Sequence, residues 1–248
     1  MPETSIEAGY PPFDVLKPVD SDIWIVDGRP LRTLGLAIPV RMTVVRLASG
    51  AIWLHSPTAH SPELQRQIEA LGPIRALVAP NIGHWMFLKD WQRACGKART
   101  FAVPMLRRRP TVKRSGVVVD EVLGDTAPRE WAEDIGQCLV RGGLGISEAA
   151  FFHRPSRTLI LADLVQNFEP EKTAGAARAA LTVAGSMAPD GKAPIHLRFV
   201  MRLKRDRARQ AASRMIEWAP ERVIFAHGRW FDRNGSAELR RSLRWLMR

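Results

Sequence analysis

The chain has 248 residues, of which 46% are hydrophobic, and its 37 basic and 25 acidic residues give a net charge of +12. This size can form one globular core, and the two cysteines, Cys95 and Cys138, are too far apart in sequence to indicate a disulfide framework or a thiolate metal site. The start of the chain lacks a secretory signal and no stretch is apolar enough for a transmembrane segment, so we predict a cytoplasmic protein.

The positive charge comes mostly from arginine and is concentrated in local clusters. Arginine forms bidentate contacts with phosphates and carboxylates, which favours a small anionic ligand as partner. The same excess is also typical of a surface rich in salt bridges. Few aromatic residues accompany the charge, so we do not expect specific nucleic-acid binding, but general polyanion binding through residues 198–214 stays open. The other clusters are 107–114 and 240–248.

The first half of the chain predicts a β-meander followed by alternating helices and strands. Turn pairs at 27–28 and 49–50 separate short apolar runs, as in antiparallel strands. Ser61 and Pro62 are typical of a helix N-terminus, and the apolar spacing after them indicates an amphipathic helix. We expect strands at 23–26, 40–47, 51–54 and 76–79, and helices at 61–71 and 87–95.

The second half predicts another sheet and further helices. We predict a single domain over residues 1–248, in which residues 1–20 form an N-terminal extension. Ser236 is expected to cap the last helix. Apolar runs indicate strands at 101–103, 117–119, 138–140, 149–152, 159–162 and 223–226, and helices are expected at 169–187, 205–218 and 236–247.

Three of these apolar runs lead to a side chain that can bind a metal. The run beginning at Ala76 leads to His84, the next to Asp163 and the last to His227. Loops just past buried strands commonly carry functional side chains, so these three would converge if their strands were neighbours. Imidazole and carboxylate are ligands that suit zinc, iron or manganese.

Each of the three residues also has a purely structural interpretation. His84 can begin a helix with its ring bonded to the backbone, and Asp163 can accept hydrogen bonds from loop N–H groups. His227 can be a buried histidine of the core. The pattern alone does not decide between these alternatives and a metal site.

The order of the elements resembles the metallo-β-lactamase superfamily over residues 20–230. The resemblance rests on Ala79-Pro-Asn-Ile-Gly-His84, on the segment from Phe151 to Leu-Ile-Leu-Ala-Asp163, and on Val-Ile-Phe-Ala-His227-Gly228. The first two segments also resemble an uncharacterised domain family of that superfamily. The resemblance implies an α/β fold, a four-layered αββα sandwich, with a one- or two-metal site at the edge between the sheets.

The chain departs from the superfamily in its main metal-binding motif. The superfamily has His-x-His-x-Asp-His, and the corresponding positions here are Asn81, Gly83, Trp85 and Met86, with His84 in an intervening place. Most of the usual ligands of this loop are therefore absent.

Other motif positions are kept in part. Residues 143–145 occupy the place of a further histidine, whereas Asp163 and His227 match the bridging aspartate and the final histidine. His55 stands where the superfamily has an aspartate that supports the ligands. We expect at most one zinc, iron or manganese ion, held by His84, Asp163 and His227, with His55 and Asn81 in supporting positions.

These observations lead to two functional hypotheses. The first is a metal-dependent hydrolase with a single ion that acts on a small, anionic substrate, with its catalytic residues unassigned. The second is a non-catalytic protein of the same fold that binds a ligand or partner through its basic surface. Loss of the histidine motif favours the second hypothesis, and retention of Asp163 and His227 favours the first.

Overall fold

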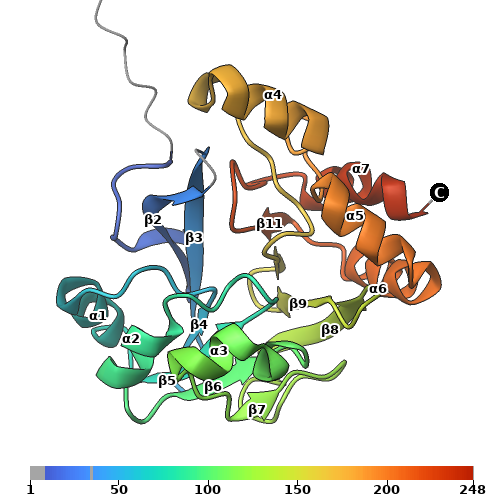
Figure 1. Ribbon diagram of the computed structural model, residues 1–248. Helices are drawn as coiled ribbons and strands as arrows, with labels where there is room; N and C mark the ends of the chain where they lie inside the picture. The colour runs from blue at the N-terminus through green and yellow to red at the C-terminus, as the bar shows by residue number, and fades with distance from the viewer. Residues whose placement is uncertain (1–8, 34–35, 248) are drawn as a thin grey trace, which may run out of the picture.

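Two β-sheets packed face to face form the centre of the protein, and helices cover their outer faces (Figure 1). The computed structural model describes residues 9–33 and 36–247. The first sheet has seven strands in the order β1-β2-β3-β4-β5-β6-β7, and the second has four in the order β11-β10-β9-β8. The resulting order of layers is helix, sheet, sheet, helix.

The first sheet changes from antiparallel to parallel pairing at β4. Strands β1 to β4 pair antiparallel and β4 to β7 pair parallel, which places the C-terminal ends of β4 and β5 side by side. Helix α1 (Pro62–Glu69) begins at Ser61, whose Oγ accepts a hydrogen bond from Leu64 N at 3.1 Å. The strands are β1 (Lys17–Asp20), β2 (Ile23–Thr33), β3 (Leu36–Arg46), β4 (Ile52–His55), β5 (Ile74–Ala79), β6 (Arg99–Ala102) and β7 (Glu121–Val122).

The helices between these strands lie together on one side of the molecule in Figure 1. They are α1, α2 (Leu88–Ala94), the 3-10 turn η1 (Leu106–Arg108) and α3 (Pro110–Ser115). Helix α3 was not predicted from the sequence. It ends at Gly116, whose φ of +72° suits glycine.

The second sheet is antiparallel from β8 to β10, and β11 joins β10 in parallel. Its strands are β8 (Ile135–Arg141), β9 (Ser147–His153), β10 (Thr158–Ile160) and β11 (Arg222–Ile224). The helical elements of this half are η2 (Pro170–Lys172), α4 (Gly175–Ala184), α5 (Ile195–Arg202), α6 (Arg205–Glu217) and α7 (Gly235–Met247). Because β10 and β11 run parallel, the residues that follow them emerge at the same edge of the sheet.

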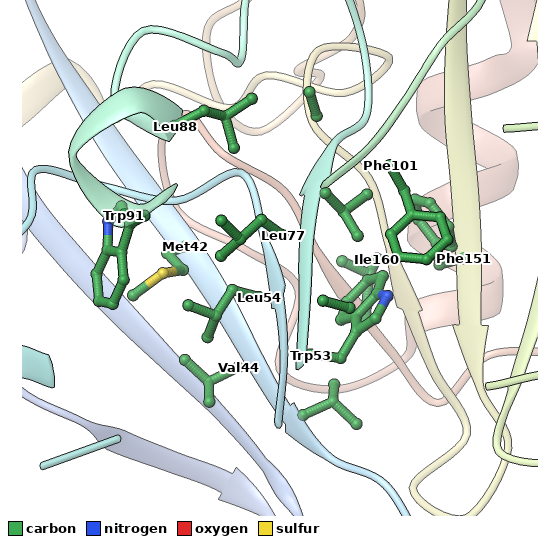
Figure 2. Close-up of a cluster of buried hydrophobic side chains, with 14 of the residues drawn as sticks. Met42, Val44, Trp53, Leu54, Leu77, Leu88, Trp91, Phe101, Phe151 and Ile160 are labelled. Carbon is green, nitrogen blue, oxygen red and sulfur yellow. The ribbon is translucent and has the colours of Figure 1, made fainter. Parts of the chain in front are cut away.

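Two clusters of buried apolar side chains stabilise the layers. The larger joins the first sheet to its helices and to the inner face of the second sheet. Figure 2 shows Trp53 and Phe151 in this cluster, where their rings meet edge to face with centroids 5.0 Å apart. The smaller cluster packs the outer face of the second sheet against α6 and α7. Alternate residues of β9 therefore belong to different clusters: Phe151 to the larger and Phe152 to the smaller.

Several predicted elements need correction. The strand expected at 117–119 is wrong, because the Gln92 side chain takes the hydrogen bonds of the Val118 backbone and the strand of this region is β7. The helix expected over 169–187 is in fact η2 followed by the shorter α4, which ends at Gly185. Ser236 does not cap α7, since its Oγ donates to Pro220 O at 2.8 Å. Helix α5 was not predicted.

Part of the expected N-terminal extension belongs to the first sheet. Residues 17–20 form β1, and Tyr10 OH donates a 2.7 Å hydrogen bond to Glu169. Residues 1–8 of the predicted extension lie outside the described residues. Among the described helices, none combines the length and the apolar character that crossing a bilayer requires.

Candidate metal centre

The loop after β5 brings His84 to the edge between the sheets. Asn81 is the second residue of this loop, and its Oδ1 accepts hydrogen bonds from Gly83 N at 2.8 Å and from His84 N at 3.2 Å. An asparagine that bonds to the backbone two and three residues ahead is a standard way to form a tight turn. The turn fixes the backbone from which the His84 side chain projects.

Asp163 and His227 reach the same point from the second sheet. Each follows the end of a strand, Asp163 after β10 and His227 after β11. The Nε2 atom of His84 lies 3.2 Å from Asp163 Oδ2, and the Nε2 atom of His227 lies 3.1 Å from Asp163 Oδ1. One ligand atom from each of the three residues lies within 4.8 Å of the others, a group that could hold a metal ion.

The second ring nitrogen of each histidine is held by another part of the protein. His227 Nδ1 donates a 2.7 Å hydrogen bond to the carbonyl oxygen of Pro39, and His84 Nδ1 shares a 2.6 Å hydrogen bond with Ser56 Oγ. A carbonyl oxygen can only accept, so Nδ1 of His227 carries a proton and Nε2 is the ring nitrogen that faces Asp163. This arrangement orients both rings toward Asp163.

The Asp163 carboxylate accepts hydrogen bonds in addition to its contacts with the histidines. Asn81 Nδ2 donates to Oδ2 at 2.7 Å and Gln166 Nε2 donates to Oδ1 at 2.9 Å. Burial alone would raise the pKa of Asp163, but the charge of His84 and the hydrogen bonds from both histidines lower it well below its ordinary value. Burial likewise opposes the charge on His84, but Asp163 and then Glu148 raise the pKa of His84. The site therefore favours the ionised form of the Asp163 side chain.

Glu148 belongs to this polar cluster, and sequence reasoning missed it. Its side chain is buried, and its carboxylate accepts hydrogen bonds from the backbone N–H groups of Ala162, Asp163 and Leu164 at 2.8, 2.9 and 3.2 Å. Asn81 Nδ2 donates to the same carboxylate at 3.0 Å. Burial and the nearby Asp163 raise the pKa of Glu148, although these donors favour its charged form. A single glutamate inside the apolar strand 147–153 was the available signal.

The other residues singled out from the sequence occupy different surroundings. His55 is buried beside Trp53 and Phe151, with ring centroids 5.6 and 5.5 Å away, and is not part of the three-residue group. Asn81 contacts Asp163 directly. Leu144, at the place of the absent histidine, is 76% exposed.

The three candidate ligands border a cavity of about 240 Å³. Its walls are mainly apolar, and no arginine or lysine lines it among the described residues. Trp85 and Met86, which occupy positions of the absent ligands, form part of the wall. The remaining lining residues are Leu31, Ile38, Val40, Ser56, Pro57, Gly83 and Phe87.

Sequence comparison assigns the chain to a family. A profile described as Domain of unknown function (DUF4336) matches residues 20–183. The chain belongs to this family. The matched segment includes His84, Glu148 and Asp163 and ends before His227. The comparison with curated proteins finds no match.

Solved structures show that this DUF4336 protein has the metallo-β-lactamase fold. A metallo-beta-lactamase from Pontibacter korlensis is 14% identical with a TM-score of 0.62, over 94% of this chain and 98% of that one. DIM-1 metallo-beta-lactamase exposed to ceftazidime is 16% identical with a TM-score of 0.64, over 94% and 95% of the two chains. FIM-1 from Pseudomonas aeruginosa, in its mono-zinc form, is 12% identical with a TM-score of 0.61, over 94% of each chain.

These comparisons confirm the predicted αββα sandwich and the resemblance to the metallo-β-lactamase superfamily. At such low identity they show the fold and not the activity.

Proposed function

We propose that this DUF4336 protein is a single-metal hydrolase in which His84, Asp163 and His227 hold one zinc, iron or manganese ion. The proposal rests chiefly on one observation: both imidazole rings present Nε2 to the same carboxylate while Nδ1 is held by Ser56 or by the Pro39 carbonyl. Metal-binding histidines commonly have their second nitrogen held in this way.

The distances in the group suit a small divalent ion. Ligand atoms around a tetrahedral ion with bonds of about 2.0 Å lie roughly 3.3 Å apart. His84 and His227 contact different oxygens of Asp163, at 3.2 and 3.1 Å, and one ligand atom from each of the three residues lies within 4.8 Å of the others. Two imidazoles and one carboxylate form a known ligand set for catalytic zinc. The mono-zinc form of FIM-1 supports a single ion on this fold.

The residues around the ion would each have a defined task. When bound, the ion would act as a Lewis acid and lower the pKa of water, so that water can attack a carbonyl or phosphoryl centre. Gln166 orients Asp163 through Oδ1, and Asn81 orients it through Oδ2. Glu148 holds the backbone on both sides of Asp163. The apolar wall would limit the water that surrounds the reacting group.

The cavity favours a substrate with an apolar group beside the bond that is cleaved. Leu31, Ile38 and Phe87 supply apolar surface, and Met86 is 56% exposed at the same cavity. The anionic substrate that net charge suggested remains a prediction, and the described cavity wall offers it no cationic partner.

Metal analysis of untagged protein tests this proposal. We expect about one equivalent of metal in the native chain and less than about 0.2 in the Asp163→Ala and His227→Ala variants. His196→Ala is the matched control, because His196 is exposed and outside the group. Native protein that stays below about 0.2 equivalents after incubation with zinc, iron and manganese in turn would falsify the single-metal proposal.

A second candidate function is a non-catalytic binding protein with the same fold. It is favoured by the polar cluster itself, since each oxygen of Asp163 already has a histidine and an amide partner. A site whose hydrogen bonds are complete is stable without an ion. This alternative predicts that Zn²⁺ leaves the melting temperature unchanged, whereas the hydrolase proposal predicts an increase that Asp163→Ala abolishes.

A further inference from the structure

Helix α5 exposes a line of large apolar side chains to solvent. Ile195, Phe199 and Leu203 are 55%, 64% and 50% exposed and are spaced four residues apart, so they lie along one face from the start of the helix to its C-cap. At 1.5 Å per residue this line is about 12 Å long. Isolated exposed apolar residues are ordinary, but an aligned set on one helix is a feature of interaction surfaces.

The opposite side of α5 is anchored to the protein. Met201 is fully buried, and Gly143 N donates a 2.8 Å hydrogen bond to the Val200 carbonyl oxygen. These contacts determine which face of α5 points outward. In Figure 1, α5 lies with α4 on the outside of the second sheet, on the side of the molecule away from α1, α2 and α3.

Basic residues surround the exposed apolar line. The segment from Lys192 to Arg205 contains five basic residues and no acidic one. Arg198 and Arg202 occupy neighbouring positions on the helix surface. Among the described residues, Lys192, Arg202 and Arg205 form no ion pair, whereas the nearby Arg244 pairs with Asp190 at 3.4 Å. The positive charge is therefore available to a partner.

A cavity of about 560 Å³ lies within this positive region. It is lined by Lys192, Arg202, Arg205, Arg244 and Trp245, so residues of α6 and α7 contribute beside the end of α5. Burial, followed by the charges of Arg198 and Arg244, lowers the pKa of Lys192, as expected for crowded cations. A cavity with these walls has the size and charge to accept a phosphate-bearing group.

We propose that the outer face of α5 docks this protein onto the surface of an anionic lipid bilayer. The exposed side chains of Ile195, Phe199 and Leu203 would enter the boundary between headgroups and acyl chains. The surrounding arginines would contact lipid phosphates, with one headgroup in the cavity beside Arg202. An apolar line flanked by basic residues is the pattern of helices that lie in a membrane interface.

Other occupants fit these features less well. A second copy of the chain would bring the same unpaired cations of α5 face to face, which costs free energy. An acidic protein partner would match the charge but would need an apolar groove of its own to receive α5, and the labelling experiment below distinguishes such a partner from a bilayer. The inference does not depend on the metal site, because these residues are separate from its ligands.

Vesicle flotation with the full chain tests the proposal. The probes are vesicles of phosphatidylcholine alone and of equal parts phosphatidylcholine and phosphatidylglycerol. We expect binding only to the anionic vesicles. This binding should weaken when added salt raises the ionic strength enough to shorten the Debye length from about 8 Å to about 3 Å. The triple variant Arg202→Gln, Lys204→Gln and Arg205→Gln should bind on the order of 100-fold more weakly.

A matched control separates this surface from net charge. Arg107→Gln, Arg108→Gln and Lys113→Gln change the same residue types at exposed positions around α3 and should retain native binding. Equal loss in the two triple variants would overturn the proposal, because it would show general attraction of a polycation. Failure of the native chain to bind anionic vesicles would overturn it as well.

A fluorescent probe tests insertion of the apolar line. The native cysteines, Cys95 and Cys138, are buried, so a cysteine at Phe199→Cys can be labelled with an environment-sensitive dye. We expect a blue shift on anionic vesicles for this site and none for Val118→Cys, which is also exposed. No shift at position 199, together with binding to polyglutamate of similar strength, would assign the face to an acidic protein partner and reject the membrane.

Discussion

Two histidines lie at or beyond the C-terminal ends of adjacent parallel strands of the first sheet, and their surroundings are opposite. His55 ends β4 and is buried between aromatic rings, and its Nε2 has no hydrogen-bond partner among the described residues. His84 follows β5, bonds through both ring nitrogens and borders a cavity. The comparison shows that a histidine at a strand end becomes a candidate ligand only when the following turn directs it out of the core.

The difference depends on the side chains that surround each ring. Asn81 turns the chain after β5 and connects the loop of His84 to Asp163 and Glu148. His55 is itself the last residue of β4, so the strand holds its ring between the sheets, against Trp53 and Phe151. Polar contacts therefore support His84, and aromatic packing supports His55.

The largest expected effect concerns the polar cluster that supports His84. Glu148→Gln keeps the size of the side chain but places an amide NH₂ where backbone N–H groups and Asn81 now donate. We expect a loss of about 3 kcal/mol in the free energy of unfolding, because buried donors lose charged acceptors. Urea denaturation measures this loss. The exposed Glu133→Gln is the control, and a loss below about 0.5 kcal/mol in Glu148→Gln would contradict this account of the cluster.

The next largest effect concerns His55 at acid pH. Burial, together with the charge of His84, lowers the pKa of His55 to about 3. Because the unfolded chain binds this proton with a pKa of about 6.5, native stability is present above pH ~6.5 and falls as the pH drops toward the folded value. His55→Phe removes this linkage and keeps an aromatic ring.

The measurement is the difference in unfolding free energy between pH 7 and pH 5 for metal-free protein. We expect His55→Phe to lose about 2 kcal/mol less than the native chain over this range. An identical loss in the two proteins would show that folding does not lower the pKa of His55. The exposed His196→Phe should behave like the native chain.

The smallest expected effect concerns the hydrogen bond that orients His84. Ser56→Ala removes the 2.6 Å contact with Nδ1 but leaves the candidate ligands in place. We expect zinc affinity to fall by about tenfold with little change in melting temperature. Ser156→Ala is a matched control, since Ser156 Oγ contacts His153 Nδ1 at 2.7 Å away from the candidate group. Equal zinc affinity in the two variants would show that the hydrogen bond between Ser56 and His84 does not support metal binding.

The sequence by itself determined much of the fold. Apolar runs with turn residues predicted most strands, because buried strands need continuous apolar surface. The cap at Ser61 predicted the start of α1 for a local reason, the need of backbone N–H groups for an acceptor. The motif around Asp163 also led to the metallo-β-lactamase resemblance, which fold comparison confirmed.

Only the tertiary structure decided which polar residues meet. Comparison with the superfamily motif placed His84 beside the usual ligand positions, but the turn at Asn81 brings its Nε2 to 3.2 Å from Asp163. The partners of Glu148 lie on segments far from it along the chain, and β9 gives no local sign of them. Local propensity depends on near neighbours, whereas a site between two sheets depends on contacts across the fold. The strand ends were therefore predictable from the sequence, and their convergence was expected only on the condition that the strands are neighbours, which the fold decides.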